Sequence, residues 1–157
     1  MARDAIARQY DVDKNSVVLF CEDDKRQYSP GTILFSARKG RSVDLEKMRE
    51  SITATRLSGG TNMRVDRLDI TARGEVVTGG PELLFKVTGT SQEFVLAEDP
   101  GAKDAFQRLR ETRGAKIVTV TGRVHGWEGR FPDVLRALAV AGQKPTRLYV
   151  TDFEVAK

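Results

Sequence analysis

Histidine, cysteine and tryptophan each occur only once in this chain of 157 residues, as His125, Cys21 and Trp127. A single cysteine cannot form an intrachain disulfide or a metal site built on a cysteine pair. A serine or cysteine nucleophile needs a neighbouring base, and no sequence signal pairs His125 with Cys21. One histidine and one cysteine are also too few for the roughly three good ligands of a zinc enzyme. The sequence therefore predicts a protein that is not an enzyme and that uses no cofactor.

Phosphate-loop and membrane-spanning motifs are missing as well. The glycine-containing stretches lack both the spacing and the Lys-Ser/Thr pair of a P-loop. No apolar run approaches the roughly 20 residues needed to cross a bilayer, so no membrane span is predicted. The N-terminus lacks the apolar core of a secretory signal, which makes a cytoplasmic location the default expectation unless a signal has been removed.

Charged residues, by contrast, are abundant and nearly balanced. Twenty-six Lys and Arg stand against 22 Asp and Glu, for a formal net charge of +4. A small basic excess permits a polyanionic partner but does not require one. Hydrophobic residues make up 39% of the chain, which is enough for a folded core.

The first part of the chain predicts an arm followed by a small unit of two strands and a helix. Residues 1–15 read as a short helix or an arm that docks on a neighbour. Two runs of β-branched and aromatic residues predict strands at 16–20 and 32–38. The unit is expected to cover residues 16–64.

The helix of this unit is expected at 43–57, with Ser42 as its N-cap. Its buried stripe follows helical spacing. The stripe consists of Leu45, Met48 and Ile52.

From residue 65 the pattern predicts three strands, a helix, a long strand, a short helix and a last strand. The first of these strands alternates apolar and polar residues over 67–77, which is typical of a half-buried strand. The first helix spans 99–114, with Asp99 as a cap, Pro100 in its first turn and Gly114 at its end. The second helix is expected at 131–141.

Three strands, a helix and two strands is the element order of the oligonucleotide/oligosaccharide-binding (OB) barrel, which residues 65–157 resemble. The resemblance implies that the helix around Phe106 covers one open end of a five-stranded barrel. It also implies a ligand face across the second and third strands. The expected fold class is thus α+β, a strand–strand–helix unit followed by an OB-like barrel.

The stretch "TILFSARKGRSVDLEKMRESITATRL" at 32–57 resembles the second half of a heavy-metal-associated domain, which has a ferredoxin-like fold. That family binds soft metal ions through two cysteines separated by two residues, and here Cys21 has no such partner. The resemblance therefore implies a degenerate domain turned to packing or interaction. Residual metal binding by Cys21 with Glu22, Asp23 and Asp24 is the alternative.

A ligand or partner surface is predicted on the barrel, where cations could contact phosphates and an aromatic ring could stack on a base. His125 is expected on the polar face of its strand, exposed to solvent. Trp127 either plugs the barrel end or joins His125 on the binding surface. The candidate residues are Lys86, Arg123, His125, Trp127 and Arg130.

The sequence thus predicts a non-enzymatic binding or adaptor protein that acts through its barrel. The partner is expected to be a protein assembly or a polyanion such as single-stranded nucleic acid. The alternative function is metal handling at Cys21.

Overall fold

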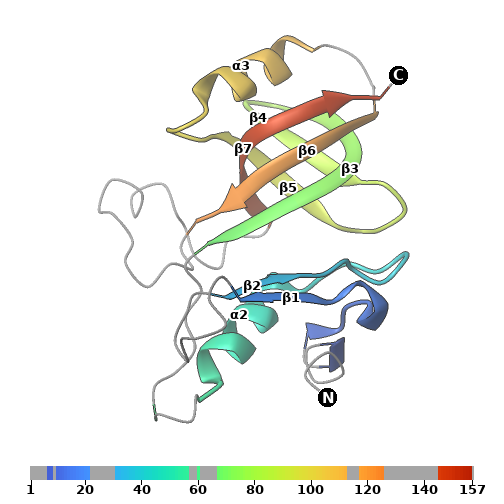
Figure 1. Cartoon of the computed structure of the whole chain (residues 1–157). Coiled ribbons are helices and arrows are strands. Elements are labelled where there is room, and N and C mark those ends of the chain that lie inside the picture. The colour runs from blue at the N-terminus through green and yellow to red at the C-terminus, as the bar shows by residue number, and fades with distance from the viewer. Residues whose placement is uncertain are drawn as a thin grey trace. The chain divides into compact units, whose positions relative to one another are not determined.

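The computed structural model describes residues 7–8, 10–21, 31–56, 60, 67–112, 117–125 and 145–156 (Figure 1). The chain divides into two compact units, Met1–Ser51 and Ile52–Lys157. Within the described residues, no helix is both long enough and apolar enough to span a membrane.

The second unit is built on five strands, and its strand order is β3-β4-β5-β7-β6 in a closed barrel. Strands β5 and β7 run parallel, and the other neighbours are antiparallel. A closed five-stranded barrel of this kind is consistent with an OB-like fold and confirms that part of the prediction. The strands are β3 (Leu68–Gly79), β4 (Glu82–Val87), β5 (Glu93–Glu98), β6 (Ile117–Val124) and β7 (Thr146–Val155).

The barrel interior is filled by alternate residues of its strands. Along β6 every second side chain is buried, because successive residues of a strand point to opposite faces. Phe85 on β4 lies directly opposite Phe94 on β5, and both are buried. The core residues of the barrel with 0% exposure are Phe85, Val120, Leu148 and Val150.

Two glycines allow strands to approach where a side chain would collide. Gly74 of β3 pairs with both β4 and β6, opposite Val87 and Val118. A Cβ there would overlap the backbone carbonyl of Lys86. At Gly122 a Cβ would lie 2.6 Å from Cγ of Leu148. Glycine at such positions permits the tight bending that barrel closure requires.

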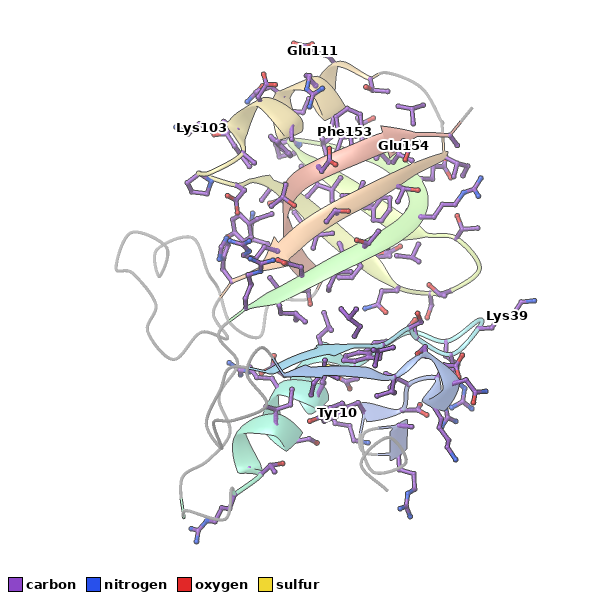
Figure 2. The ribbon with its side chains drawn as sticks, in the orientation of Figure 1. Tyr10, Lys39, Lys103, Glu111, Phe153 and Glu154 are labelled. Atoms are coloured by element: carbon purple, nitrogen blue, oxygen red, sulfur yellow. The ribbon has the colours of Figure 1, made fainter. Side chains whose placement is uncertain are left out.

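The helix α3 (Lys103–Glu111) covers one end of the barrel, as Figure 1 shows. Its buried residues are Ala105 and Leu109, whereas Phe106 is only half-buried. The guanidinium of Arg108 lies 5.6 Å from the ring centre of Phe153 on β7. Figure 2 shows Phe153 beneath this helix. The predicted helical lid is therefore present, but Leu109 is its central buried residue.

The predicted cap of α3 is wrong. The helix begins at Lys103 after Ala102, which makes no capping hydrogen bond through its side chain. The Oδ1 atom of Asp99 instead accepts a hydrogen bond of 2.8 Å from the backbone N–H of Gly101. Asp99 thereby forms a tight turn before the helix, and its other carboxylate oxygen is directed elsewhere.

The first unit contains a two-stranded antiparallel sheet, β1 (Val18–Cys21) with β2 (Gly31–Leu34). A short 3-10 helix, η1 (Lys14–Ser16), precedes it. Strand, strand and helix occur in the predicted order, but a ferredoxin-like unit is not established by this arrangement. Cys21 is the last residue of β1 and lies opposite Gly31. The three acidic residues expected beside Cys21 lie outside the described residues.

The helix α2 (Leu45–Ala54) follows the sheet. The backbone N–H of Lys47 donates a 3.0 Å hydrogen bond to Oδ1 of Asp44, so Asp44 rather than Ser42 caps this helix. Two residues of the predicted stripe, Met48 and Ile52, are buried, and Leu45 is half-buried.

Candidate functional site

Three of the five predicted surface residues lie within the described part of the barrel. These are Lys86 on β4, Arg123 on β6 and His125 just after β6; Trp127 and Arg130 lie outside the described residues. Lys86 and Arg123 are the partners of two different residues of β3, Glu75 and Asp69. Six residues of a strand span about 20 Å, so the structure does not bring these two cations together.

Lys86 lies between acidic residues. Its Nζ atom is 3.9 Å from Oε1 of Glu93, its neighbour on β5. On the other side, Glu75 of β3 is its directly paired residue. The charge of Lys86 is therefore compensated locally.

Arg123 is also paired with a carboxylate. Its Nε atom donates a 3.0 Å hydrogen bond to Oδ1 of Asp69, whose Oδ2 atom accepts one of 2.6 Å from Arg67. One carboxylate thus holds two guanidinium groups at the start of β3. The remaining positive charge here is one unit at most.

His125 is buried, so the expectation that it lies exposed on a polar strand face is wrong. Its Nε2 atom lies 3.1 Å from Oδ2 of Asp99, and both side chains are at most 9% exposed. The imidazole meets the ring of Tyr149 edge to face at a centroid distance of 4.6 Å. A buried imidazole requires a hydrogen-bonding partner, and the turn after β5 supplies one in Asp99.

Tyr149 joins this group from β7. Burial raises the pKa of its hydroxyl; the positive charge of Arg147 lowers that pKa, and the negative charge of Asp99 raises it. Sequence reasoning missed Asp99 and Tyr149 because Asp99 was interpreted as a helix cap and Tyr149 as a strand residue. A local sequence pattern cannot predict a contact between residues that are distant in the chain.

The outside of the barrel has a polar part on β3 and β6. The hydroxyl oxygens of Thr71 and Thr121, which are paired residues of the two strands, are 3.0 Å apart. Around this pair, the outward positions in 69–73 of β3 and 119–123 of β6 are occupied by charged or polar residues. They are Asp69, Arg73, Thr119 and Arg123.

A different part of the outside is apolar at its centre. Because Phe85 and Phe94 point inward, their neighbours Leu84 and Val95 point outward, and these two are paired across β4 and β5. Val77 of β3 is the partner of Leu84 on its other side. Val77 and Leu84 are half-buried, and Val95 is only 6% exposed.

Ion pairs frame this apolar centre. Arg147 on β7 is the direct partner of Val95, yet its Nη2 atom lies 3.0 Å from Oε1 of Glu82 on β4. The Arg147–Glu82 pair therefore passes over β5 next to Val95. We call this surface the β4–β5 outer face. It consists of Val77, Leu84 and Val95 with the pairs Glu82–Arg147 and Lys86–Glu93.

The β4–β5 outer face is apolar at its centre and charged at its rim. Its cations are each within 4 Å of a carboxylate, so the face has no excess positive charge. Within the described ranges, no three His, Cys, Asp or Glu side chains form a group that could hold a metal ion. An apolar centre with a charged rim is typical of a protein–protein interface.

Comparisons of this chain with family models, curated protein sequences and solved structures gave no match.

Proposed function

We propose that this protein is a non-enzymatic binding module and that its partner is another protein. The partner would contact the β4–β5 outer face. The observation that carries the proposal is the outward-facing cluster of Val77, Leu84 and Val95.

The charge pattern favours a protein partner over single-stranded nucleic acid at this face. A nucleic-acid groove tracks the phosphate backbone with unpaired cations and stacks bases on exposed aromatic rings. Here the cations Lys86 and Arg147 are matched by Glu93 and Glu82, and Glu75 adds a further negative charge. The outward residues at the centre are aliphatic. A phosphate chain would gain little attraction from such a surface.

The contrast between the two outer parts of one barrel provides a matched test. A photoactivatable amino acid, benzoylphenylalanine, replaces Leu84 in one variant and Thr71 in another, and both are expressed in cells of the source organism. We expect a discrete protein adduct from position 84 and none from position 71, because only the first position lies on the apolar face.

The captured protein is then purified, and its affinity for the intact chain is measured by calorimetry. The variant Leu84→Lys should weaken binding at least about tenfold, since it places an unpaired charge in the centre of the contact. The control Thr71→Lys should leave the affinity unchanged. An adduct only at position 71, or equal losses in both lysine variants, would overturn the proposal.

Metal handling at Cys21 stays a prediction that no observation here favours over binding. Its test is stoichiometric uptake of Cu(I) or Zn(II) by the intact chain and by the Cys21→Ser variant.

A further inference from the structure

A second surface with different chemistry lies in the first unit, at the turn after β2. Residues 38–41 have the sequence Arg-Lys-Gly-Arg, three cations in four positions. The backbone N–H of Arg41 donates a 3.0 Å hydrogen bond to the carbonyl of Arg38, which closes a β-turn. Gly40 has a φ of 74°, as the third position of a type II turn requires.

This turn is attached to an earlier segment of the same unit. Val12 and Ala37 form an antiparallel bridge, and the backbone N–H of Asp13 donates to the carbonyl of Ser36 at 2.9 Å. The Nε atom of Arg38 also donates to the carbonyl of Val12 at 3.3 Å. The base of the turn is therefore fixed by the segment around Val12.

Asp11 holds the two arginines of the turn side by side. Its Oδ1 atom is 3.3 Å from Nη1 of Arg38, and its Oδ2 atom is 3.2 Å from Nη1 of Arg41. Asp11 has a φ of 53°, a left-handed conformation that Asp and Asn tolerate better than most residues. All three side chains remain between 46% and 62% exposed.

The arrangement leaves an accessible excess of positive charge. Arg38, Lys39 and Arg41 contribute three positive charges, and Asp11 contributes one negative charge, which leaves two. Figure 2 shows Lys39 at the tip of the turn with its side chain directed away from the chain. The barrel cations, in contrast, are matched one to one on the β4–β5 outer face.

We propose that the turn Arg38–Arg41 binds the phosphate backbone of a nucleic acid. The carboxylate of Asp11 occupies the position between two guanidinium groups that two phosphate oxygens would take, since guanidinium groups bind carboxylate and phosphate oxygens alike. Asp11 acts as an internal competitor that keeps the arginines aligned until phosphate replaces it. Binding of this kind reads no bases and is sequence-independent.

Nucleic acid fits this turn better than an anionic membrane does. A membrane-surface site combines cations with apolar side chains that enter the bilayer. Residues 36–42 contain no apolar side chain larger than that of Ala37. Phosphates repeated along a flexible strand match a small, wholly polar cluster of cations.

The test uses the intact chain and a fluorescein-labelled strand of about 12 thymidine nucleotides, with anisotropy as the readout. Two net charges predict a slope of log affinity against log salt of about −1.4, from about 0.7 per neutralised phosphate on single strands. Arg41→Gln should weaken binding several-fold and reduce the slope by about 0.7. Asp11→Asn should tighten binding, because it removes the competing carboxylate and retains a residue suited to the left-handed conformation.

The matched control is Asp104→Asn on α3. Asp104 pairs with Arg108 at 3.3 Å, so this change also releases an arginine, but in the other unit. We expect it to leave the affinity for the strand unchanged. Circular dichroism confirms that each variant is folded.

Three results would overturn the proposal. The first is no binding at about 20 mM salt, where phosphate contacts are strongest. The second is equal tightening by Asp104→Asn and Asp11→Asn, which would indicate attraction by overall charge. The third is binding to phosphatidylserine vesicles that depends on Arg41 while the labelled strand is not bound.

Discussion

Asp99 and His125 lie 26 positions apart in the chain, and their side chains meet at 3.1 Å in a buried contact. Asp99 follows β5 and His125 follows β6, so the contact joins the ends of two strands that β7 separates in the barrel. The two oxygens of the Asp99 carboxylate have different partners: Oδ1 accepts a hydrogen bond from the backbone N–H of Gly101, and Oδ2 faces Nε2 of His125. This single residue connects the entry of α3 to the end of β6.

Replacing Asp99 by alanine should destabilise the barrel. The variant would leave the buried Nε2 of His125 without this acceptor, at a cost of about 1–3 kcal/mol in the free energy of unfolding. Urea denaturation followed by circular dichroism measures the loss. Asp99→Asn keeps an acceptor oxygen and should lose less; an alanine variant as stable as the parent would contradict the role assigned to the pair.

Alanine at the two close-approach glycines should be costly, and unequally so. At Gly122 the new methyl group would press mainly on the side chain of Leu148 and would also lie 2.9 Å from the backbone carbonyl oxygen of Tyr149, and repacking should cost about 1–3 kcal/mol. At Gly74 it would meet the backbone carbonyl of Lys86, which cannot move without breaking the β3–β4 pairing. We therefore expect Gly74→Ala to lower the midpoint of thermal unfolding more than Gly122→Ala does. The reverse order would show that β3 and β4 can separate more easily than the side chain of Leu148 can move.

The loss of stability on shortening a side chain of α3 should depend on how deeply that side chain is buried. Leu109 is 1% exposed, and Leu109→Ala should reduce the free energy of unfolding by about 2–5 kcal/mol through the cavity it leaves. Phe106 is half-buried, so Phe106→Ala removes less buried surface and should cost less. Denaturant midpoints for the two variants compare them directly. A larger loss of stability for Phe106→Ala than for Leu109→Ala would contradict the assignment of Leu109 as the central buried residue of α3.

Alkaline pH should destabilise the barrel partly through Tyr149. Burial raises the pKa of this tyrosine in the folded state, so between about pH 10 and the higher folded pKa the unfolded chain releases the proton more readily. Stability is therefore fully present below about pH 10 and falls as the pH rises through that window. Tyr149→Phe should flatten the fall, as measured by urea midpoints from pH 8 to about 11. If the stability of the Tyr149→Phe variant fell with pH as steeply as that of the parent, the raised pKa of Tyr149 would be contradicted.

Much of the barrel could be predicted from residue order. The alternation of Leu68, Ile70 and Ala72 predicted a half-buried strand, and β3 has that pattern. Pro100 and Gly114 marked a helix between the third and fourth strands of the barrel, where α3 lies. These features depend on neighbours within a few positions, so local pattern was sufficient.

The candidate site was less predictable for a physical reason. Lys86 and Arg123 were selected for their charge, but whether a cation is available depends on the residue across the strand. Glu93 and Asp69 occupy those positions, and strand register places them there. The basic turn at 38–41 was visible in the sequence only as a turn, because its pairing with Asp11 joins segments about 30 residues apart.

The sequence by itself determined the order of the described barrel strands with α3 between β5 and β6, and the inward-facing core. These properties follow from the period of apolar residues and from composition. Tertiary structure alone decided that His125 is buried against Asp99, that Lys86 and Arg147 are each paired with a carboxylate and that Val77, Leu84 and Val95 share one outer face. Each of those outcomes depends on which strands lie side by side and in which register, and a shift of one residue would turn every side chain to the opposite face.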